Sequence, residues 1–179
     1  IIIRPAVVFG ENNFGNVYNL IIQIKSKFYA IIGSGQNIKS IAYVKNVVES
    51  VLFAINNIDN MYFEYNYSDY PQISTEELSK KICDQLKISY PFKIPLILTY
   101  FLTFPIDILE KFFRTDLKFN SNRVKKFTDS TFFISDKIRN RGFMPTFNLE
   151  VSLSNTIDWI SNNKVKELRS NWYSKAKKL

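Results

Sequence analysis

Apolar residues in the first half of the chain alternate between two spacings. Continuous or alternating apolar runs are typical of strands, whereas apolar residues three and four positions apart form one face of a helix. The first run, broken only by Arg4 and Pro5, predicts a strand that is buried on both faces and leaves its sheet at Gly10. The resulting strand–helix alternation favours α/β architecture. The predicted elements are strands over 1–9, 28–32 and 61–67, helices over 16–27 and 44–55, and a helix through Leu86 that Ser74–Glu77 begins as a capping box.

The second half of the chain is less regular and mostly helical in pattern. The apolar segment over 92–113 contains two prolines and four charged residues, so it lacks the roughly 20 uninterrupted apolar residues of a membrane span. We expect this segment to form a buried helical pair, with partial exposure to lipid as the alternative. Further helices are predicted over 135–141, stopped by Gly142, and from Leu149 to Ile160.

Composition predicts a folded protein and excludes several kinds of site. With 46% hydrophobic and 22% charged residues, 179 residues are enough for one ordinary globular domain. The absence of histidine excludes Ser/His/Asp triads, Cys/His dyads and imidazole metal ligands within this chain, and we expect no metal site. The single Cys83 lies in an apolar helical pattern and is expected to be buried and reduced, as in a cytoplasmic protein.

The net charge of +8 is concentrated at the C-terminal end. Residues 163–179 carry six basic residues against one acidic residue, which accounts for +5 of the total. The rest of the chain has no basic stripe interleaved with aromatic residues, so we expect no nucleic-acid partner. Residues 163–179 are interpreted as a solvated basic tail.

Three stretches, taken in order, resemble the C-terminal half of extended short-chain dehydrogenases/reductases of the NAD-dependent epimerase/dehydratase family. The similarity spans nearly all of 1–160 and is greatest to sugar-nucleotide epimerase-like enzymes of bacterial polysaccharide synthesis. The stretches are Arg4-Pro5-Ala6-Val7-Val8-Phe9-Gly10, the run from Gly33-Ser34-Gly35 through Tyr43-Val44 to Val47, and Phe133-Ile134-Ser135-Asp136-Lys137 followed by Gly142-Phe143-Met144-Pro145 and Trp159.

The resemblance implies a division of labour between two halves of a longer protein. An N-terminal Rossmann half binds NAD or NADP and carries a catalytic Tyr-x-x-x-Lys pair, whereas the C-terminal half holds the substrate. This chain has neither a G-x-x-G-x-x-G loop at a first strand nor that pair, so we assign it no catalytic residue and expect the pair upstream. We expect a Rossmann-like parallel sheet portion over 1–90, a mostly helical substrate-binding lobe over 91–162, and the tail over 163–179.

Two positions at strand ends are candidates for the cofactor side of the site. By resemblance, Arg4 and Pro5 end a strand beside the nicotinamide, although a proline such as Pro5 also commonly ends the hydrogen-bond pairing of a strand.

Asn16 is a candidate for substrate binding. It opens the helix after the following loop, where an N-cap side chain and free backbone N–H groups suit a substrate phosphate. Ordinary helix capping is the alternative for Asn16.

Three further residues are candidates for substrate binding. Lys39 occupies the position at which many family members place an arginine on the substrate pyrophosphate, and a lysine supplies a point charge without the bidentate fork. Tyr43 begins a helix facing the same cleft, with core packing as the alternative. Arg123 is similar to a basic position of the substrate lobe that closes on a diphosphate. Solvated surface positions are the alternatives for Lys39 and Arg123.

The resemblance implies that the chain is the substrate-binding portion of an NAD(P)-dependent epimerase, dehydratase or reductase acting on a nucleoside diphosphate sugar. Val7 replaces a substrate-binding asparagine of several family members, and Asn46 replaces a commoner aspartate, which changes a structural hydrogen bond. A reductase of non-sugar alcohols or ketones and an inactive binding module therefore remain alternatives. A homodimer of the complete protein is the expected assembly. Taken alone, the chain is expected to expose apolar surface that the Rossmann half covers.

Overall fold

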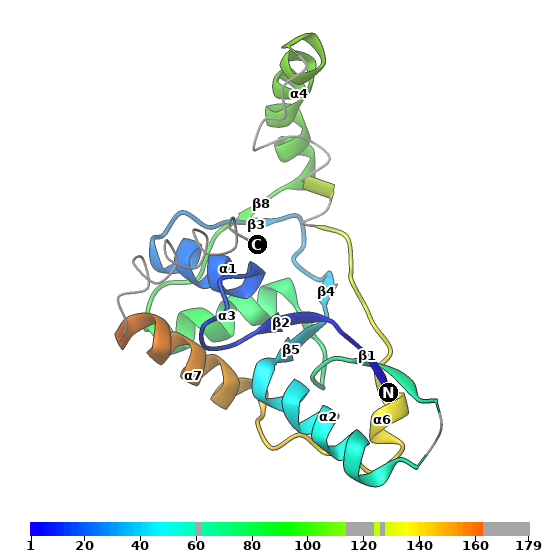
Figure 1. Cartoon of the computed structure of the whole chain (residues 1–179). Helices are drawn as coiled ribbons and strands as arrows, with labels where there is room; N and C mark the ends of the chain where they lie inside the picture. Colours follow the sequence, from blue (N-terminus) through cyan, green and yellow to red (C-terminus); the bar gives the residue numbers. More distant parts are fainter. Residues whose placement is uncertain (60–61, 114–123, 126–127, 163–179) are drawn as a thin grey trace, which may run out of the picture. The chain divides into compact units, whose positions relative to one another are not determined.

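The computed structural model describes residues 1–59, 62–113, 124–125 and 128–162 (Figure 1). The chain forms two compact units, and each is built from separate segments of sequence. Unit 1 contains Ile1–Ile22, Ser40–Pro71 and the described residues from Phe133 onward, whereas unit 2 contains Gln23–Lys39 and the described residues of Gln72–Phe132. The chain therefore passes from one unit to the other four times.

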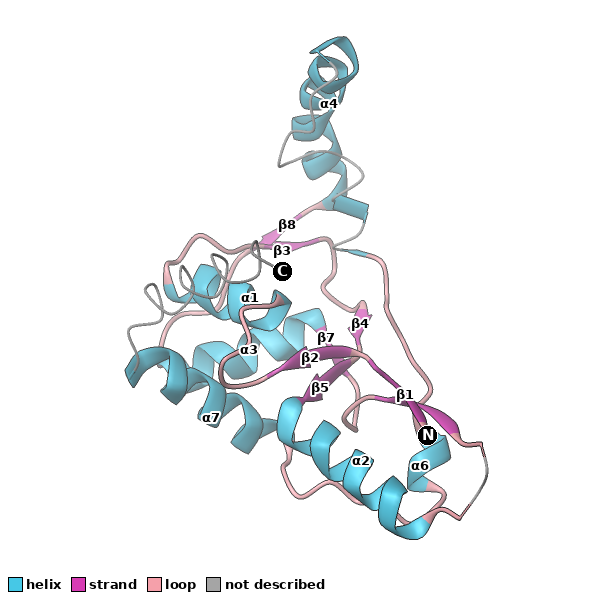
Figure 2. Cartoon of the chain, viewed as in Figure 1, coloured by secondary structure: helices cyan, strands magenta, loops and turns pink. Residues whose placement is uncertain are grey.

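The strands of unit 1 form two parallel pairs. Strand β1 (Ile2–Pro5) pairs with β6 (Glu64–Tyr67). Strand β2 (Val7–Phe9) pairs with β5 (Ile41–Tyr43), and Figure 2 shows these two strands side by side. The prediction of one continuous strand over 1–9 is therefore wrong. The chain changes partner at Ala6, whose backbone N–H donates to Tyr67 O at 2.8 Å.

The prediction that the first strand is buried on both faces is also wrong for β1. Ile1 and Ile2 are exposed by 52% and 44% of their surface, and each strand of unit 1 has one partner among the described strands. This exposed apolar surface agrees with the expectation for the chain taken alone.

Helices pack on the pairs to form the core of unit 1. The helices are α1 (Asn16–Lys25), which begins in unit 1, α2 (Val44–Asn57), α6 (Asp136–Arg139) and α7 (Leu149–Asn162), all close to the predicted bounds. The buried core cluster contains Ala42, Ala54, Ile58, Phe63, Tyr65, Tyr67, Ile138 and Phe143.

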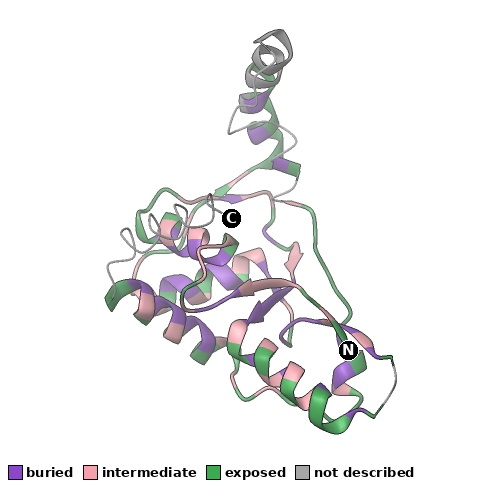
Figure 3. Cartoon of the chain, in the orientation of Figure 1, coloured by how far each residue is buried: buried purple, intermediate pink, exposed green. Residues whose placement is uncertain are grey.

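Helix α2 turns an unexpected face inward. Its buried residues are Asn46, Ser50 and Ala54, whereas Leu52 and Ile55 of the predicted apolar face are exposed by 54% and 61%. Figure 3 shows that much of this helix is coloured as exposed. The 3.6-residue periodicity correctly predicts the helix, but small and polar residues face the strands. The inward face of α2 is therefore held by hydrogen bonds as well as by apolar packing.

Unit 2 is built around helix α3 (Thr75–Leu86) and two short strand pairs. Strand β3 (Ile31–Ile32), shorter than the predicted strand over 28–32, is parallel to β8 (Lys93–Ile94). Strand β4 (Ile38–Lys39) is antiparallel to β7 (Ile73–Ser74). The predicted capping box at Ser74 and the buried position of Cys83 are both confirmed.

Helix α4 (Leu96–Phe113) follows β8 as one helix with Pro105 inside it, so the predicted helical pair is wrong. The prediction that this segment is buried is also wrong, because Ile97 and Phe101 are exposed by 81% and 80%. Among the described residues, no helix combines the length and apolar character needed to cross a membrane.

The architecture is mixed α/β with parallel strand pairs, which confirms the fold class expected from the sequence. The two compact units do not coincide with the expected division into 1–90 and 91–162. Unit 1 combines segments from both parts, because the residues from Phe133 onward belong with Ile1–Ile22 and Ser40–Pro71. The functional division into sheet portion, substrate lobe and tail stays a prediction, and 163–179 lies outside the described residues.

Replacing Ser74 with alanine is expected to destabilise unit 2 by about 1–2 kcal/mol. The Ser74 hydroxyl accepts a bond from the Glu77 N–H and donates to its carboxylate, and both bonds are lost in the variant. Urea unfolding of the variant beside wild type measures the change. The control is Ser89→Ala, which changes an exposed serine. Equal losses of unfolding free energy in the two variants would contradict a capping role for Ser74.

Candidate functional site

The carboxyl ends of β2 and β5 form a polar edge in unit 1. These parallel strands end in register at Phe9 and Tyr43, and ligands of open α/β sheets bind outside such ends. Gly10 follows with φ +144°, and a Cβ there would lie 2.5 Å from Val44 Cγ1. Only glycine therefore allows the loop after β2 to pass this close to the start of α2.

A cluster around Glu11 covers this edge. The Glu11 carboxylate accepts hydrogen bonds from Tyr43 Oη at 2.9 Å and Lys45 Nζ at 2.7 Å, and Asn155 Nδ2 donates to Tyr43 Oη at 3.3 Å. Burial raises the pKa of Glu11, but the bonds from Lys45 and Tyr43 outweigh burial and leave that pKa below its ordinary value. Glu11 is thus a carboxylate held between a lysine and a tyrosine.

Tyr43 lies in the core rather than on an open surface. Its side chain is fully buried, with Phe9 and Phe147 rings at centroid distances of 5.5 Å, and burial raises the pKa of its hydroxyl. This is the packing role considered as the alternative for Tyr43. Contact of Tyr43 with a substrate stays a prediction.

A second polar cluster is centred on the buried carboxylate of Asp69. This carboxylate accepts hydrogen bonds from Tyr43 N at 2.7 Å, Asn46 Nδ2 at 3.0 Å and Tyr67 Oη at 3.0 Å. Burial raises the pKa of Asp69, and the three donors act in the opposite direction. Sequence reasoning missed Asp69, for which the only signal was a carboxylate close after an aromatic strand.

Asn46 joins this cluster to the segment that precedes α7. Its amide donates to Phe147 O at 2.8 Å and accepts from Phe147 N at 3.1 Å, 101 residues further along the chain. The family resemblance places an aspartate at position 46. In this chain Asn46 donates to the Asp69 carboxylate, and an aspartate at position 46 would lack that donor.

The structure places the other unit 1 candidates at exposed positions. Arg4 forms an ion pair with Glu64 at 2.9 Å, and Pro5 lies opposite Tyr67 at the end of β1. Asn16 is exposed as the first residue of α1, which confirms that it opens the helix. Roles of these three residues toward a cofactor or a phosphate stay predictions.

In unit 2, Lys39 lies on β4 and is half-buried. Its ammonium donates to Asp129 O at 2.6 Å, and its backbone forms a bridge with Thr131. Burial lowers the pKa of Lys39, while the nearby charge of Asp129 raises it. Lys39 is thus a partly desolvated cation beside a carbonyl oxygen. Arg123, the other basic candidate, lies outside the described residues.

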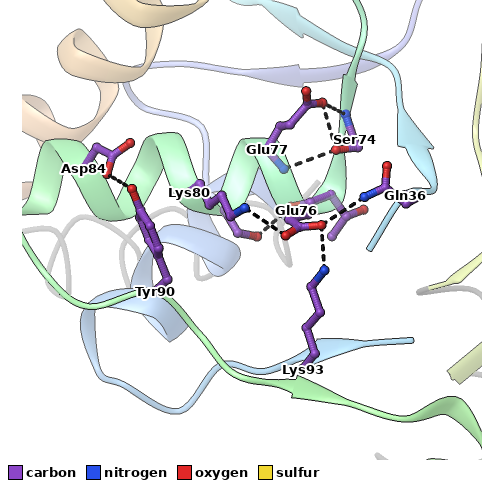
Figure 4. A network of polar contacts seen from close by, with 10 residues as sticks. Gln36, Ser74, Glu76, Glu77, Lys80, Asp84, Tyr90 and Lys93 are labelled. Carbon is purple, nitrogen blue, oxygen red and sulfur yellow. Dashed lines mark hydrogen bonds and ion pairs between the residues drawn. The ribbon is translucent and has the colours of Figure 1, made fainter. Parts of the chain in front are cut away.

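The loop before Lys39 is fixed by Glu76, as Figure 4 shows. The Glu76 carboxylate accepts hydrogen bonds from Gln36 Nε2 at 3.0 Å, Lys93 Nζ at 2.8 Å and Lys80 Nζ at 2.9 Å. These two lysines lower the pKa of Glu76 to about 2. Because Glu76 also donates its backbone N–H to Gly35 O, one residue ties the loop to α3 and β8.

Within the described part of the chain, no group of three or more acidic or cysteine side chains could hold a metal ion. The groups that the two clusters and Lys39 present are carboxylate, amide, hydroxyl and ammonium groups, and they hydrogen-bond within the chain.

Comparison with known proteins shows what this chain is similar to. No family model matches the chain. It is 36% identical over 159 residues to N-acetyl-alpha-D-glucosaminyl-diphospho-ditrans,octacis-undecaprenol 4-epimerase of Escherichia coli O157:H7, an alignment covering 88% of this chain and 48% of that protein. The chain is thus related to an epimerase over about half of that protein's length. This confirms the resemblance inferred from the three sequence stretches.

Solved structures of epimerases share the fold at low sequence identity. A nucleoside-diphosphate-sugar epimerase of Pseudomonas aeruginosa matches with a TM-score of 0.64 and 17% identity over 90% of this chain and 48% of that one. The UDP-glucuronic acid 4-epimerase of Bacillus cereus, in complex with UDP-glucuronic acid and NAD, matches with a TM-score of 0.61 and 17% identity over 90% and 45%. The chain thus spans about half the length of these epimerases.

Replacing Asn46 with aspartate is expected to destabilise unit 1 by about 3–5 kcal/mol, because it sets a second buried carboxylate against Asp69. The loss should shrink at acidic pH, where one of the two carboxyls becomes protonated and can donate. Urea unfolding at pH 7 and pH 5 measures both effects. The double variant Asn46→Asp/Asp69→Asn restores a donor–acceptor pair and should recover part of the loss. Wild-type stability of the single variant at pH 7 would refute this account.

The Glu76→Gln variant is expected to change the pH dependence of stability. The pKa of Glu76 is about 2 in the folded chain against an ordinary 4.5, so its stabilising effect is complete above pH 4.5 and is lost as the pH falls through about 2. The gap in unfolding free energy between wild type and variant should be constant from pH 6 to 8 and close in acid. Asp59→Asn removes the same charge elsewhere and is the control. A gap that persists unchanged in acid would contradict the ion-pair origin.

Proposed function

We propose that the chain is the substrate-side half of an NAD(P)-dependent 4-epimerase that acts on an N-acetylhexosamine linked through a diphosphate to a polyprenol. The observation that carries this proposal is the 36% identity, over 88% of the chain, to an epimerase named for such a substrate. The solved relatives share the fold at 13–17% identity, which is too low to transfer their substrates.

A nucleoside diphosphate sugar, the substrate expected from the sequence, is the second candidate. It is supported by structural neighbours in complex with UDP-glucuronic acid or UDP-glucose. Both candidates contain a sugar diphosphate and differ in the group beyond it, which is a nucleoside in one case and an isoprenoid chain in the other. A diphosphate-binding role for this chain is therefore common to both.

Two residues of the chain are proposed to bind the diphosphate. Lys39 supplies a partly desolvated ammonium group, and Asn16 stands at a helix N-terminus, where free N–H groups attract anions. The charge of Lys39 acts as a point attraction and sets no fixed orientation. Arg123 is proposed as a further cationic contact, by family resemblance alone.

The cofactor is proposed to be bound mainly outside this chain. The sequence has no glycine-rich dinucleotide loop of the Rossmann type, so its residues do not form a dinucleotide site of their own. Arg4 and Pro5 at the end of β1 are proposed to lie beside the nicotinamide, which in this family takes hydride from the sugar and returns it. The cytoplasmic location and the homodimer expected from the sequence also stay predictions.

The decisive experiment supplies the whole protein with NAD and either N-acetylglucosaminyl-diphospho-undecaprenol in detergent or UDP-N-acetylglucosamine. Product sugars are released by mild acid and separated as the two C4 epimers. Conversion of the lipid-linked sugar alone supports the proposal, whereas conversion of the UDP sugar alone supports the second candidate. Turnover of a simple ketone with neither sugar converted would favour the non-sugar reductase. Binding of sugar without turnover would favour an inactive module.

Replacing Lys39 with alanine is expected to raise KM for the accepted sugar diphosphate about tenfold or more while kcat changes less. The reason is that a charge-assisted hydrogen bond contributes about 1.5–3 kcal/mol. Lys25→Ala, at the end of α1, removes the same charge elsewhere and should leave KM unchanged. An unchanged KM in the Lys39 variant, with a normal unfolding curve, would remove Lys39 from the site.

A further inference from the structure

Helix α4 has its polar and apolar faces reversed relative to a helix in water. Thr99 and Thr103 are buried, at 2% and 0% exposure, whereas Ile97, Phe101 and Phe104 are exposed by 81%, 80% and 65%. Amphipathic helices of globular proteins turn apolar residues inward and polar residues outward. The outward face of α4 is therefore suited to contact an apolar medium.

The buried threonines do not require polar partners from elsewhere in the fold. Thr99 Oγ1 donates to Pro95 O at 3.2 Å, and Thr103 Oγ1 donates to Tyr100 O at 3.2 Å, so each hydroxyl is bonded within or at the start of its own helix. The inward face can thus be polar in composition without a cost in unpaired groups.

The exposed face lies in a long uncharged stretch. No charged residue occurs from Pro95 to Ile106, and most residues there are aromatic or aliphatic. A single exposed apolar residue needs no explanation, but several on one helix mark a contact surface. A helix with such a face can lie in the plane of a bilayer interface with its apolar side chains turned toward the lipid.

The sequence that continues from α4 is strongly basic. Residues 114–126 carry five basic residues against one acidic residue, which are Arg114, Lys118, Arg123, Lys125 and Lys126 against Asp116. Basic residues next to an apolar helix are attracted to anionic phospholipids by about 1 kcal/mol for each charge near the surface. Charge and apolar surface therefore favour the same partner.

We propose that α4 lies in the headgroup region of an anionic lipid bilayer, with Ile97, Phe101 and Phe104 inserted toward the acyl chains. This inference rests on the proposed function, because a sugar on a polyprenol diphosphate is held at the membrane surface by its isoprenoid chain. A protein that docks there meets its substrate by diffusion in two dimensions. The exposed face of α4 then brings unit 2, which contains Lys39, to the membrane surface at which the lipid-linked sugar is held.

The test measures co-flotation of the whole protein with vesicles of phosphatidylethanolamine and phosphatidylglycerol. Wild type should float with the vesicles, and the variant Ile97→Ser/Phe101→Ser/Phe104→Ser should bind at least about tenfold more weakly, since each buried apolar side chain contributes favourably. Phe28→Ser removes another exposed aromatic side chain, at 89% exposure, from the same unit and should float as wild type does. Circular dichroism and thermal unfolding check the fold, and Phe101→Ser alone is used if the triple variant does not fold.

The outcomes separate this inference from the proposed function. The α4 variant should turn over a water-soluble sugar diphosphate on a short isoprenoid at the wild-type rate. Only its turnover of the long-chain substrate in vesicles should fall. If wild type converts no polyprenol-linked sugar yet floats through α4, the proposed function fails and the docking stands. Equal flotation of variant and wild type overturns the docking. A change from dimer to monomer in sedimentation, with flotation unchanged, would assign the face to a second copy instead.

Discussion

The buried carboxylate of Asp69 connects the parts of unit 1. It accepts hydrogen bonds from the end of β5, from α2 and from β6, and through Asn46 it reaches the segment before α7. A buried carboxylate is tolerated only when donors surround it, so these elements can come together only in one arrangement. The polar edge around Glu11 depends on that arrangement, because Tyr43 contributes its N–H to Asp69 and its hydroxyl to Glu11.

Local signals in the sequence predicted most helices and the family, but not which faces are buried. The capping box at Ser74 was predictable because it depends on residues three positions apart. The inward face of α2 was not, since the burial of Asn46 and Ser50 depends on Asp69 and Tyr65 from distant segments. The same limit applies to α4, whose apolar pattern indicated burial in a core although its side chains are exposed.

The candidate site was predicted in its chemistry more than in its geometry. Arg4, Pro5, Asn16, Lys39 and Tyr43 came from motif resemblance, and the structure places four of them in unit 1 and Lys39 in unit 2. Periodicity could not reveal Glu11 or Asp69, because a single acid in a loop has no pattern until its partners are known. Glu76 was predictable as part of a helix start, but its three donors come from α3, β8 and a loop.

The repeated passage of the chain between its two units has a consequence for synthesis on the ribosome. Unit 1 joins residues about 100 positions apart, such as Asn46 and Phe147, and Ser40 accepts a hydrogen bond from the Phe133 N–H. Such high contact order slows folding, because chain entropy is lost before long-range contacts compensate for it. The pairs β1–β6 and β2–β5 can form once Tyr67 has emerged, but Tyr65 and Tyr67 stay uncovered until Ile138 and Phe143 join the core. We expect this interval to be the stage at which the nascent chain depends most on chaperones.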